Sequence, residues 1–272
     1  MDYRDTQTYA AAIRIAAVIM VARASASHLG SALSMVDLLA VLYGEVLRLN
    51  PANSKWAERD RFILSKGHAC VSLYAALANR GFFSAEELSN YGKDGSRLMS
   101  HISHEVPGVE FSTGSLGHGL PFGCGKALAA KRKKEKWRSF VLLSDGELDE
   151  GSNWEAILFA PQHRLDNLVV IVDYNKIQSL GSVSAVLELE PLAEKFRAFR
   201  WTVKEIDGHD HTAIRGALAS VPFEKGKPSC IIAHTIKGKG VDFMENQLKW
   251  HYSSPDQEQL KSALAQIQGS IS

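Results

Sequence analysis

Residues 139–151, SFVLLSDGELDEG, decide the fold class, because an aliphatic run ends abruptly in four acids and two glycines. An aliphatic run of this length is typical of a strand that is buried on both faces of a sheet. A second such run follows at residues 168–176, LVVIVDYNK, and it also ends in polar residues. A helical pattern over residues 150–163 separates the two runs. A strand, a helix and a strand in this order predict two parallel strands joined by a crossover helix.

The same alternation of strand and helix continues along the chain. Three further runs of strand length stand at residues 61–64, 202–206 and 230–233. Further helical patterns cover residues 188–199 and 212–221. Parallel strands need a crossover element between them, and aliphatic strands are covered on both faces. We therefore predict an α/β fold that is doubly wound, with a mainly parallel sheet and helices on both faces.

The two ends of the chain are expected to be helical. Apolar residues recur at helical spacing over residues 9–20 and 35–46, with Ser34 as the predicted N-cap of the second helix. No internal repeat or low-complexity linker divides the chain, so we predict a single domain over residues 1–272. The tail at about residues 255–272 is expected to be a helix that frays.

Composition narrows the class of partner and the compartment. Lysine and arginine number 31 against 30 acids, and the net charge of +1 gives no electrostatic reason to expect a nucleic acid or a membrane. No apolar run reaches the roughly 18 residues of a membrane span, and the N-terminus does not resemble a signal peptide. The cysteines show no paired spacing, which argues for a reducing compartment and against zinc: Cys70, Cys124 and Cys230. We predict a cytoplasmic protein.

Polar residues follow the two aliphatic strands at the point where each strand ends. Asp145 follows the first strand, and Asn175 follows the second strand 30 positions later. A right-handed crossover of that length sets both strand ends on one edge of the sheet, so the two side chains are expected to converge. Their oxygens suit Mg²⁺ completed by phosphate and water, and Gly146 permits close approach of a phosphate. The alternative is an acidic, solvated helix N-terminus with no ligand.

The region resembles the thiamine diphosphate motif, and the chain is similar to the N-terminal domain of transketolase. The motif is carried by SDGELDEG at residues 144–151 with DYNKI at 173–177. Further matching blocks follow the family's order: SASHLGSALS at 25–34, RDRFILSKGHA at 59–69, PGVEFSTGSLGHG at 107–119, HTIKGKG at 234–240 and WHYSSP at 250–255. The matching blocks are spread over most of the chain, which makes the resemblance specific.

The resemblance implies a set of ligands for magnesium-bound thiamine diphosphate. The implied ligands of Mg²⁺, or of Ca²⁺ or Mn²⁺ in its place, are Asp145, the side chain of Asn175 and the backbone oxygen of Ile177. The implied contacts to the cofactor come from Gly146, Glu150 and Asn175, and from the segment against the ring system, Gly114, Ser115 and Leu116. Ser144 stands where the motif has a leading glycine, which is a departure from the family's pattern.

Four of the ten histidines match the family's active-site set, and the resemblance implies catalytic roles for them: His28, His68, His101 and His251. By the same resemblance His68 and His251 reach the diphosphate, while His28 and His101 surround the donor sugar. The ordinary reading of any single histidine is a satisfied core or surface residue, but these four lie within matching blocks. His104 and His118 have no assigned role, and His118 replaces the glutamine of better-known members.

The resemblance also implies a missing half. In the family, a second domain supplies the glutamate that activates the cofactor and the aromatic pocket for its pyrimidine ring. We therefore expect this chain to be the N-terminal subunit of a split transketolase, active only with a C-terminal subunit, with two copies of each chain. Glu150 and Glu155 match family glutamates at that interface, or they are simply acids favoured by a helix N-terminus.

The implied reaction moves a two-carbon ketol group from a ketose phosphate to an aldose phosphate; which sugars are used is not evident from the sequence. Two alternatives stay open. One is half of another thiamine diphosphate enzyme, such as deoxyxylulose-phosphate synthase, although SKGHA and PGVEFSTGSLG fit transketolase better. The other is a non-catalytic module that binds thiamine diphosphate and regulates a full-length enzyme, and the complete histidine set argues against it.

Overall fold

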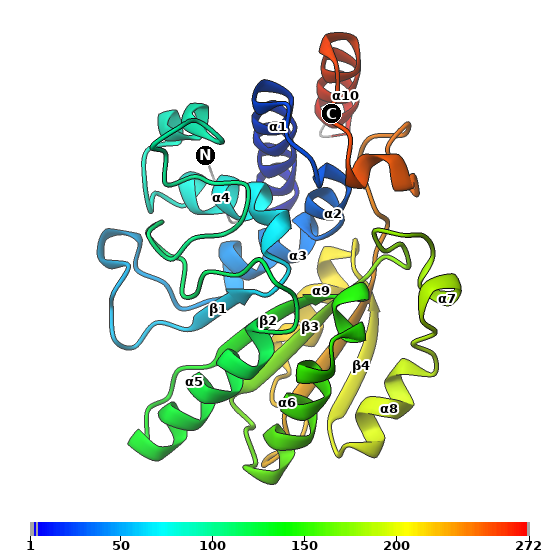
Figure 1. Ribbon diagram of the computed structural model, residues 1–272. Helices are drawn as coiled ribbons and strands as arrows, with labels where there is room; N and C mark the ends of the chain where they lie inside the picture. Colours follow the sequence, from blue (N-terminus) through cyan, green and yellow to red (C-terminus); the bar gives the residue numbers. More distant parts are fainter. Residues whose placement is uncertain (1–2, 4, 271–272) are drawn as a thin grey trace.

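Five parallel strands form one sheet in the order β1-β2-β3-β5-β4 (Figure 1). The structure is a computed structural model that describes residue 3 and residues 5–270. The strands are β1 Arg61–Leu64, β2 Ser139–Ser144, β3 Leu168–Tyr174, β4 Thr202–Asp207 and β5 Ser229–His234. Each predicted strand is present, extended by at most two residues at an end, so the predicted parallel α/β sheet is confirmed.

Helices connect the strands and cover the sheet. The helices are α1 Thr6–Ala24, α2 Leu29–Ser34, α3 Val36–Val41, α4 Cys70–Asn79, α5 Gly119–Lys133, α6 Gly151–Gln162, α7 Val183–Val186, α8 Leu192–Ala198, α9 His211–Ala219 and α10 Gln257–Gly269. The shorter helical turns are η1 Leu42–Val46, η2 Pro51–Asn53, η3 Gly67–Ala69, η4 Ala85–Asn90, η5 Gly146–Asp149 and η6 Leu248–His251. Figure 1 shows α5 and α6 in front of the sheet, with α1, α2, α4 and α10 beyond its upper edge.

The strands are buried on both faces, as their aliphatic composition predicts. Successive strand side chains point to opposite faces. Phe140 and Leu142 therefore join the apolar cluster built with α1 to α4, α9 and α10. Val141 and Leu143 join the other cluster, built with α5, α6 and α8. The two cores hold the sheet rigidly, so the residues that follow β2 and β3 are fixed at its carboxyl edge.

The predicted N-cap at Ser34 is wrong. The predicted helix over residues 35–46 is present as α3 followed by η1, but its N-cap is Met35, and Ser34 is the last residue of the separate helix α2. The reason is a contact that is distant in sequence: the Ser34 hydroxyl is buried and donates a 2.5 Å hydrogen bond to Asp173 Oδ2 on β3. A hydroxyl committed to a buried carboxylate cannot cap the helix that follows it.

Helix α1 is a packed core helix, although it is long and apolar enough to cross a membrane. It has 19 residues and a hydropathy of 1.2, so the expectation that no segment reaches this length is wrong by that measure. Arg14 and two threonines interrupt the apolar residues of α1 and hide this length in the sequence. Half of its apolar window is buried inside the protein, and the helix contacts α3, α4 and α10.

The predicted C-terminal helix is present as α10. Its N-terminus carries a capping box in which Asp256 and Gln259 satisfy each other's backbone N–H groups. Ala263 and Ile267 are buried on the side facing α1. The fraying of its end stays a prediction, and residues 271 and 272 lie outside the described part of the chain. The single-domain organisation also stays a prediction.

Candidate active site

The ends of β2 and β3 bring the predicted metal ligands together. Ser144 pairs with Asp173 in the parallel register, so the residues just beyond them leave the sheet at the same edge. Asp145, Asn175 and Ile177 line one cleft of about 230 Å³. Gly146 lines the same cleft, and a Cβ atom at this position would lie 2.9 Å from Gln178 Cγ. The convergence expected from the crossover topology is therefore present.

Asp145 is a buried carboxylate without an ion-pair partner in the described structure. Its oxygens accept hydrogen bonds from two backbone groups, Gly146 N–H at 2.7 Å and Lys176 N–H at 2.5 Å. Burial raises the pKa of Asp145 to about 6, and the neighbouring Asp173 carboxylate adds to this. A buried acid with a raised pKa is one that a cation would stabilise in its ionised form.

Asn175 and Ile177 complete the set of oxygen atoms. The Asn175 amide donates to Asp173 Oδ2 at 3.4 Å and accepts from Ile177 N–H at 3.2 Å, which fixes its orientation. The Ile177 carbonyl accepts a 2.8 Å hydrogen bond from Lys237 Nζ. An ammonium group therefore lies against one of the predicted ligands.

These oxygen atoms fit a hard divalent cation that arrives with its own anionic ligand. The set contains one carboxylate, one amide oxygen and one carbonyl oxygen. Among residues 3 and 5–270, no group of three His, Cys, Asp or Glu side chains is arranged to hold a metal. Mg²⁺ commonly takes one or two protein oxygens and fills its shell with phosphate and water. A metal-bound diphosphate therefore fits the residues better than an isolated metal ion.

Glu147 and Glu150, which belong to the same acidic stretch, do not line the cleft. Glu147 is fully buried, accepts from the Ser65 hydroxyl and accepts from Gly117 N–H at 3.0 Å. Glu150 is exposed at the N-terminus of α6, and Ser115 is exposed as well, so the structure brings neither of them into the cleft. Their predicted cofactor contacts stay predictions. The predicted interface residue Glu155 lies on α6 in a separate groove beside α5.

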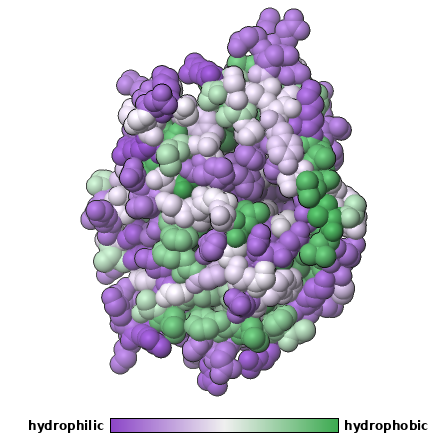
Figure 2. Space-filling view, viewed as in Figure 1, coloured by the Kyte–Doolittle hydropathy of each residue, from purple (hydrophilic) through white to green (hydrophobic). Residues whose placement is uncertain are grey.

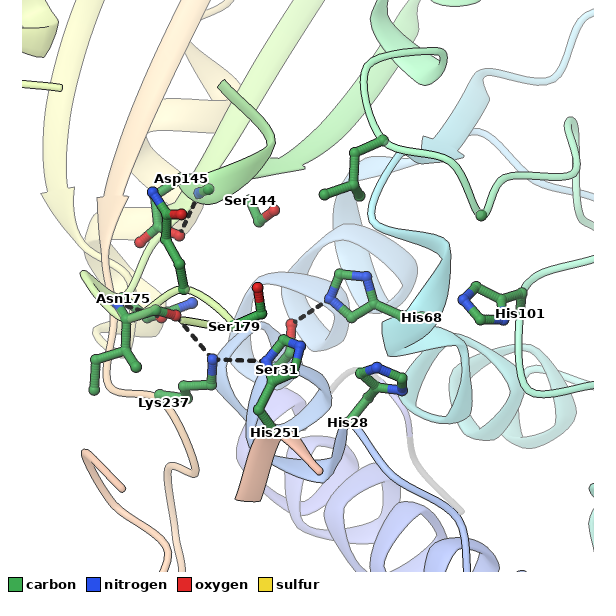
Figure 3. Close-up of a pocket in the computed structure, with 15 residues that line it drawn as sticks. His28, Ser31, His68, His101, Ser144, Asp145, Asn175, Ser179, Lys237 and His251 are labelled. Atoms are coloured by element: carbon green, nitrogen blue, oxygen red, sulfur yellow. Dashed lines mark hydrogen bonds between the residues drawn. The ribbon is translucent and has the colours of Figure 1, made fainter. Parts of the chain in front are cut away.

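The four predicted histidines meet in this cleft, and Gly114 and Leu116 line it with them. Figure 3 shows the four rings gathered at one end, with Asp145 and Asn175 at the other. The ring centroid of His28 lies 5.1 Å from His68, 6.1 Å from His101 and 5.0 Å from His251. These residues come from four segments that are far apart in the sequence. Their catalytic roles stay predictions.

The pKa values of three of these histidines are lowered, which favours their neutral form. Burial lowers the pKa of His68 well below its usual value. Burial and the charges of His101 and Lys237 lower the pKa of His28 to about 4, and burial with Lys237 lowers that of His251 to about 3. Neutral imidazoles can donate one hydrogen bond and accept another, which suits uncharged hydroxyl groups of a sugar.

The backbone of His28 is strained at this site. His28 has φ 70°, in the left-handed region that few residues other than glycine adopt. Its backbone N–H donates a 2.9 Å hydrogen bond to the His251 carbonyl, which ties two of the histidine segments together. Strain of this kind persists only where surrounding contacts hold it, and it is common at functional sites.

Lys237 and Ser31 are among the cleft residues that were not predicted from the sequence. Lys237 is 1% exposed, burial lowers its pKa to about 8, and it donates to His251 Nδ1 at 3.0 Å. Ser31 Oγ lies 3.0 Å from His68 Nε2. Both stand in blocks that match the family, so a residue-by-residue comparison of HTIKGKG and SASHLGSALS would have found them. His104 and His118 are exposed and lie outside the cleft.

Residues 5–268 match the family described as "Transketolase, thiamine diphosphate binding domain". The chain is 42% identical over 250 residues to an apulose-4-phosphate transketolase subunit of Phocaeicola vulgatus, covering 92% of this chain and 89% of that protein. It is 40% identical over 265 residues to the 6-deoxy-6-sulfo-D-fructose transketolase subunit SqwG of Clostridium sp., covering 97% and 96%. The predicted resemblance is therefore confirmed.

Solved structures agree with the sequence relatives. The transketolase from Campylobacter jejuni superposes with a TM-score of 0.92 and 34% identity, covering 97% of this chain and 42% of that chain. The transketolase from Leishmania mexicana gives a TM-score of 0.91 and 31% identity, covering 97% and 41%. The chain thus spans less than half the length of these two enzymes. Together with the family match, these relationships show that the chain belongs to the transketolase family, as its thiamine diphosphate-binding domain.

Proposed function

We propose that this chain is the thiamine diphosphate-binding subunit of a two-chain transketolase. The reaction is the transfer of a two-carbon ketol group from a ketose phosphate to an aldose phosphate. The observation that carries the proposal is the meeting of an oxygen-rich strand edge and four histidines in one cleft. A module that only bound the diphosphate would need the strand edge and not the whole histidine set.

The residues present fit magnesium-bound thiamine diphosphate. Asp145, Asn175 and Ile177 would hold the metal, and Gly146 and His68 would lie beside the diphosphate. Thiamine diphosphate, when bound, supplies a carbanion sink for cleavage of a carbon–carbon bond next to a carbonyl. The protein's part is to bind and orient the reactants, exclude water and carry protons.

The hydrogen bonds of His251 show which of its ring nitrogens can donate into the cleft. An ammonium group can only donate, so His251 Nδ1 accepts from Lys237 and the proton of the ring is on Nε2. His251 therefore presents an N–H group that can bind an anionic or carbonyl oxygen. His101 is exposed at the open end of the cleft, where it can hold a sugar hydroxyl or exchange a proton with it. A site built to pair a hydroxyl disfavours a donor that lacks it.

A partner chain is part of the proposal. The two relatives of similar length are named as subunits. In this chain, apolar side chains stay exposed on the segment that follows the cleft residue Ser179. Figure 2 shows an apolar strip along the right-hand edge of the view, where Figure 1 places α7. The exposed apolar residues of this segment are Leu180, Val186 and Leu187. We propose that the partner is a C-terminal transketolase subunit, with two copies of each chain, and that the complex is cytoplasmic, where three free cysteines would stay reduced.

The test is reconstitution. The tagged chain is isolated from its native source with whatever chain accompanies it, and the complex is assayed for ketol transfer with thiamine diphosphate and Mg²⁺. Because two relatives are named for different sugars, a panel of ketose donors is required, including sulfonated and phosphorylated ketoses. We expect transfer only when both chains are present. A tightly bound partner without ketol transfer from any donor would contradict the proposal and favour a regulatory module.

A further inference from the structure

A second cluster of polar residues, buried or half-buried, lies outside the cleft lining, and the proposed function does not use it. Asp37 on α3 is its centre, and three side chains surround it. Asp37 Oδ2 accepts hydrogen bonds from the Arg14 guanidinium at 2.5 Å and from His209 Nδ1 at 2.7 Å. Asp37 Oδ1 accepts one from His211 Nε2 at 3.0 Å. We call these four residues the Asp37 cluster.

The hydrogen bonds of the cluster fix the tautomer of His209. Burial alone would raise the pKa of Asp37, but Arg14 and the hydrogen bonds of the two histidines outweigh it and hold the pKa well below its usual value. An ionised carboxylate only accepts, so His209 Nδ1 carries a proton. His209 Nε2 accepts a 2.8 Å hydrogen bond from Ile236 N–H, so this nitrogen is unprotonated and the ring is neutral.

The Asp37 cluster forms hydrogen bonds to the backbone of the loop that carries Lys237, one before that residue and one after it. His209 holds the N–H group of Ile236, directly before Lys237. Arg14 Nε donates at 3.2 Å to the carbonyl of Lys239, two residues after Lys237. The Lys237 side chain is packed over α2, because a Cβ atom on Gly30 would lie 3.2 Å from Lys237 Cγ. Its ammonium then reaches Ile177 and His251 in the cleft.

We propose that His209 is a positioning residue: by accepting from Ile236 N–H it sets the Lys237 ammonium against the Ile177 carbonyl and His251. His209 touches neither the cleft nor its ligands, since it is absent from the cleft lining. Its effect passes through one backbone hydrogen bond. The inference rests on the proposed function in that Lys237 faces the predicted diphosphate and metal site.

Two substitutions separate the two bonds of His209. In His209→Gln the amide oxygen reaches the former Nε2 position and can accept from Ile236 N–H, while the donor to Asp37 is lost. In His209→Asn the amide nitrogen takes the former Nδ1 position and keeps the donor to Asp37, while the acceptor for Ile236 is lost. His211→Asn is the matched control, because it disturbs the same cluster without contacting the loop.

The first readout is binding of thiamine diphosphate with Mg²⁺ to the complex with its partner chain, measured by calorimetry. We expect His209→Asn to weaken binding about tenfold, the effect of losing one partly buried hydrogen bond, and His209→Gln and His211→Asn to stay within about threefold of the parent. A greater loss in His209→Gln than in His209→Asn, or equal losses in all three variants, would overturn the proposal by indicating a structural role for the whole cluster.

The second readout needs no cofactor and uses the full chain alone. Amide hydrogen exchange is measured at Ile236, and the ¹³Cε signal of Lys237 is recorded in labelled protein. We expect Ile236 to lose protection and the Lys237 signal to shift in His209→Asn, and neither to change in His211→Asn. An unchanged Ile236 amide in His209→Asn would overturn the proposal. If the parent complex bound no thiamine diphosphate while the Ile236 result held, the proposed function would fail and the positioning role would stand.

Discussion

Two buried aspartates lie at the carboxyl ends of neighbouring strands, and they differ in their hydrogen-bond partners and in their pKa values. Asp173 is the next-to-last residue of β3 and is fully buried against Lys66, Thr235 and the Ser34 hydroxyl. Asp145 follows β2 and receives only backbone N–H groups. Burial would raise the pKa of both, but Lys66 and the hydrogen bonds outweigh it and lower the pKa of Asp173, whereas that of Asp145 rises to about 6.

The difference teaches which carboxylate supports the fold and which waits for a ligand. Asp173 forms a buried ion pair with Lys66 in which both side chains have 0% exposure, so its charge is compensated by the protein itself. Asp145 faces the cleft and forms no ion pair with any residue that the structure describes, and Lys237 contacts the neighbouring Ile177 carbonyl. Removing a partner from the first site should damage stability, while removing the second carboxylate should damage binding.

The largest expected effect is on Lys66. Lys66→Met leaves the Asp173 carboxylate buried without a counter-charge, so we expect the free energy of unfolding to fall by about 3–5 kcal/mol. Denaturant unfolding of the parent and variant measures this change. The double variant Lys66→Met with Asp173→Asn is the control, and it should recover part of the loss because no unpaired charge is left. A loss below about 1 kcal/mol for Lys66→Met would remove the contrast between the two aspartates.

The next effect is on Asp145. Asp145→Ala removes the only carboxylate of the predicted metal set, so we expect the affinity of the assembled complex for thiamine diphosphate with Mg²⁺ to fall about 100-fold. Unfolding of the chain without metal should change by no more than about 1 kcal/mol, since no ion pair is broken. Calorimetric titration measures the first quantity. Unchanged affinity would mean that Asp145 is not a metal ligand and that, like Asp173, it has a structural role.

A smaller effect is expected at the open end of the cleft. His101→Ala removes an exposed side chain that we predict acts on the donor sugar, so ketol transfer should fall about tenfold to 100-fold. Affinity for thiamine diphosphate should stay within about threefold, because the predicted diphosphate contacts are made elsewhere. Steady-state kinetics and titration on the same complex measure both. Equal losses of transfer and affinity would indicate that His101 supports the shape of the cleft.

The sequence predicts the residues that line the cleft, such as Asp145, better than the residues that support the fold, such as Asp173. Asp145 and Asn175 could be placed because each directly follows an aliphatic strand and the crossover rule sets both strand ends on one edge. The four histidines and the Ile177 carbonyl needed the family resemblance, since nothing local in the sequence distinguishes His28 from His104.

The supporting contacts could not be predicted because they join residues that are distant along the chain. Ser34 donates to Asp173 across 139 positions, which turned a predicted helix cap into a core contact. Glu147 stands in the acidic stretch but points inward to Gly117. Lys66 and Asp173 are 107 positions apart, and lysine and aspartate are residue types that are usually exposed, so the sequence gives no sign that these two are buried. Such pairings depend on how α2, β1 and β3 pack together.

The smallest expected effect is the dependence of stability on pH, and His28 is its source on the cleft side. Burial first, then His101 and Lys237, lower the pKa of His28 from 6.5 to about 4. Between these pH values the unfolded chain binds a proton at His28 that the folded chain does not bind. The free energy of unfolding therefore falls as the pH drops from 6.5 to 4, and this residue causes no change above 6.5.

Because the His28 ring is partly exposed, we expect its contribution to be about 1–2 kcal/mol, less than the full shift would give. His28→Asn removes the titrating group, and asparagine tolerates the left-handed backbone of this position. The difference between the unfolding curves of parent and variant at pH 7 and pH 4.5 isolates His28 from the other histidines. His163→Asn, an exposed substitution at the end of α6, is the matched control. If the parent and His28→Asn lost equal stability over this range, the cleft would tolerate a charged His28, and the neutral histidine cluster that we infer beside Asp145 would be wrong.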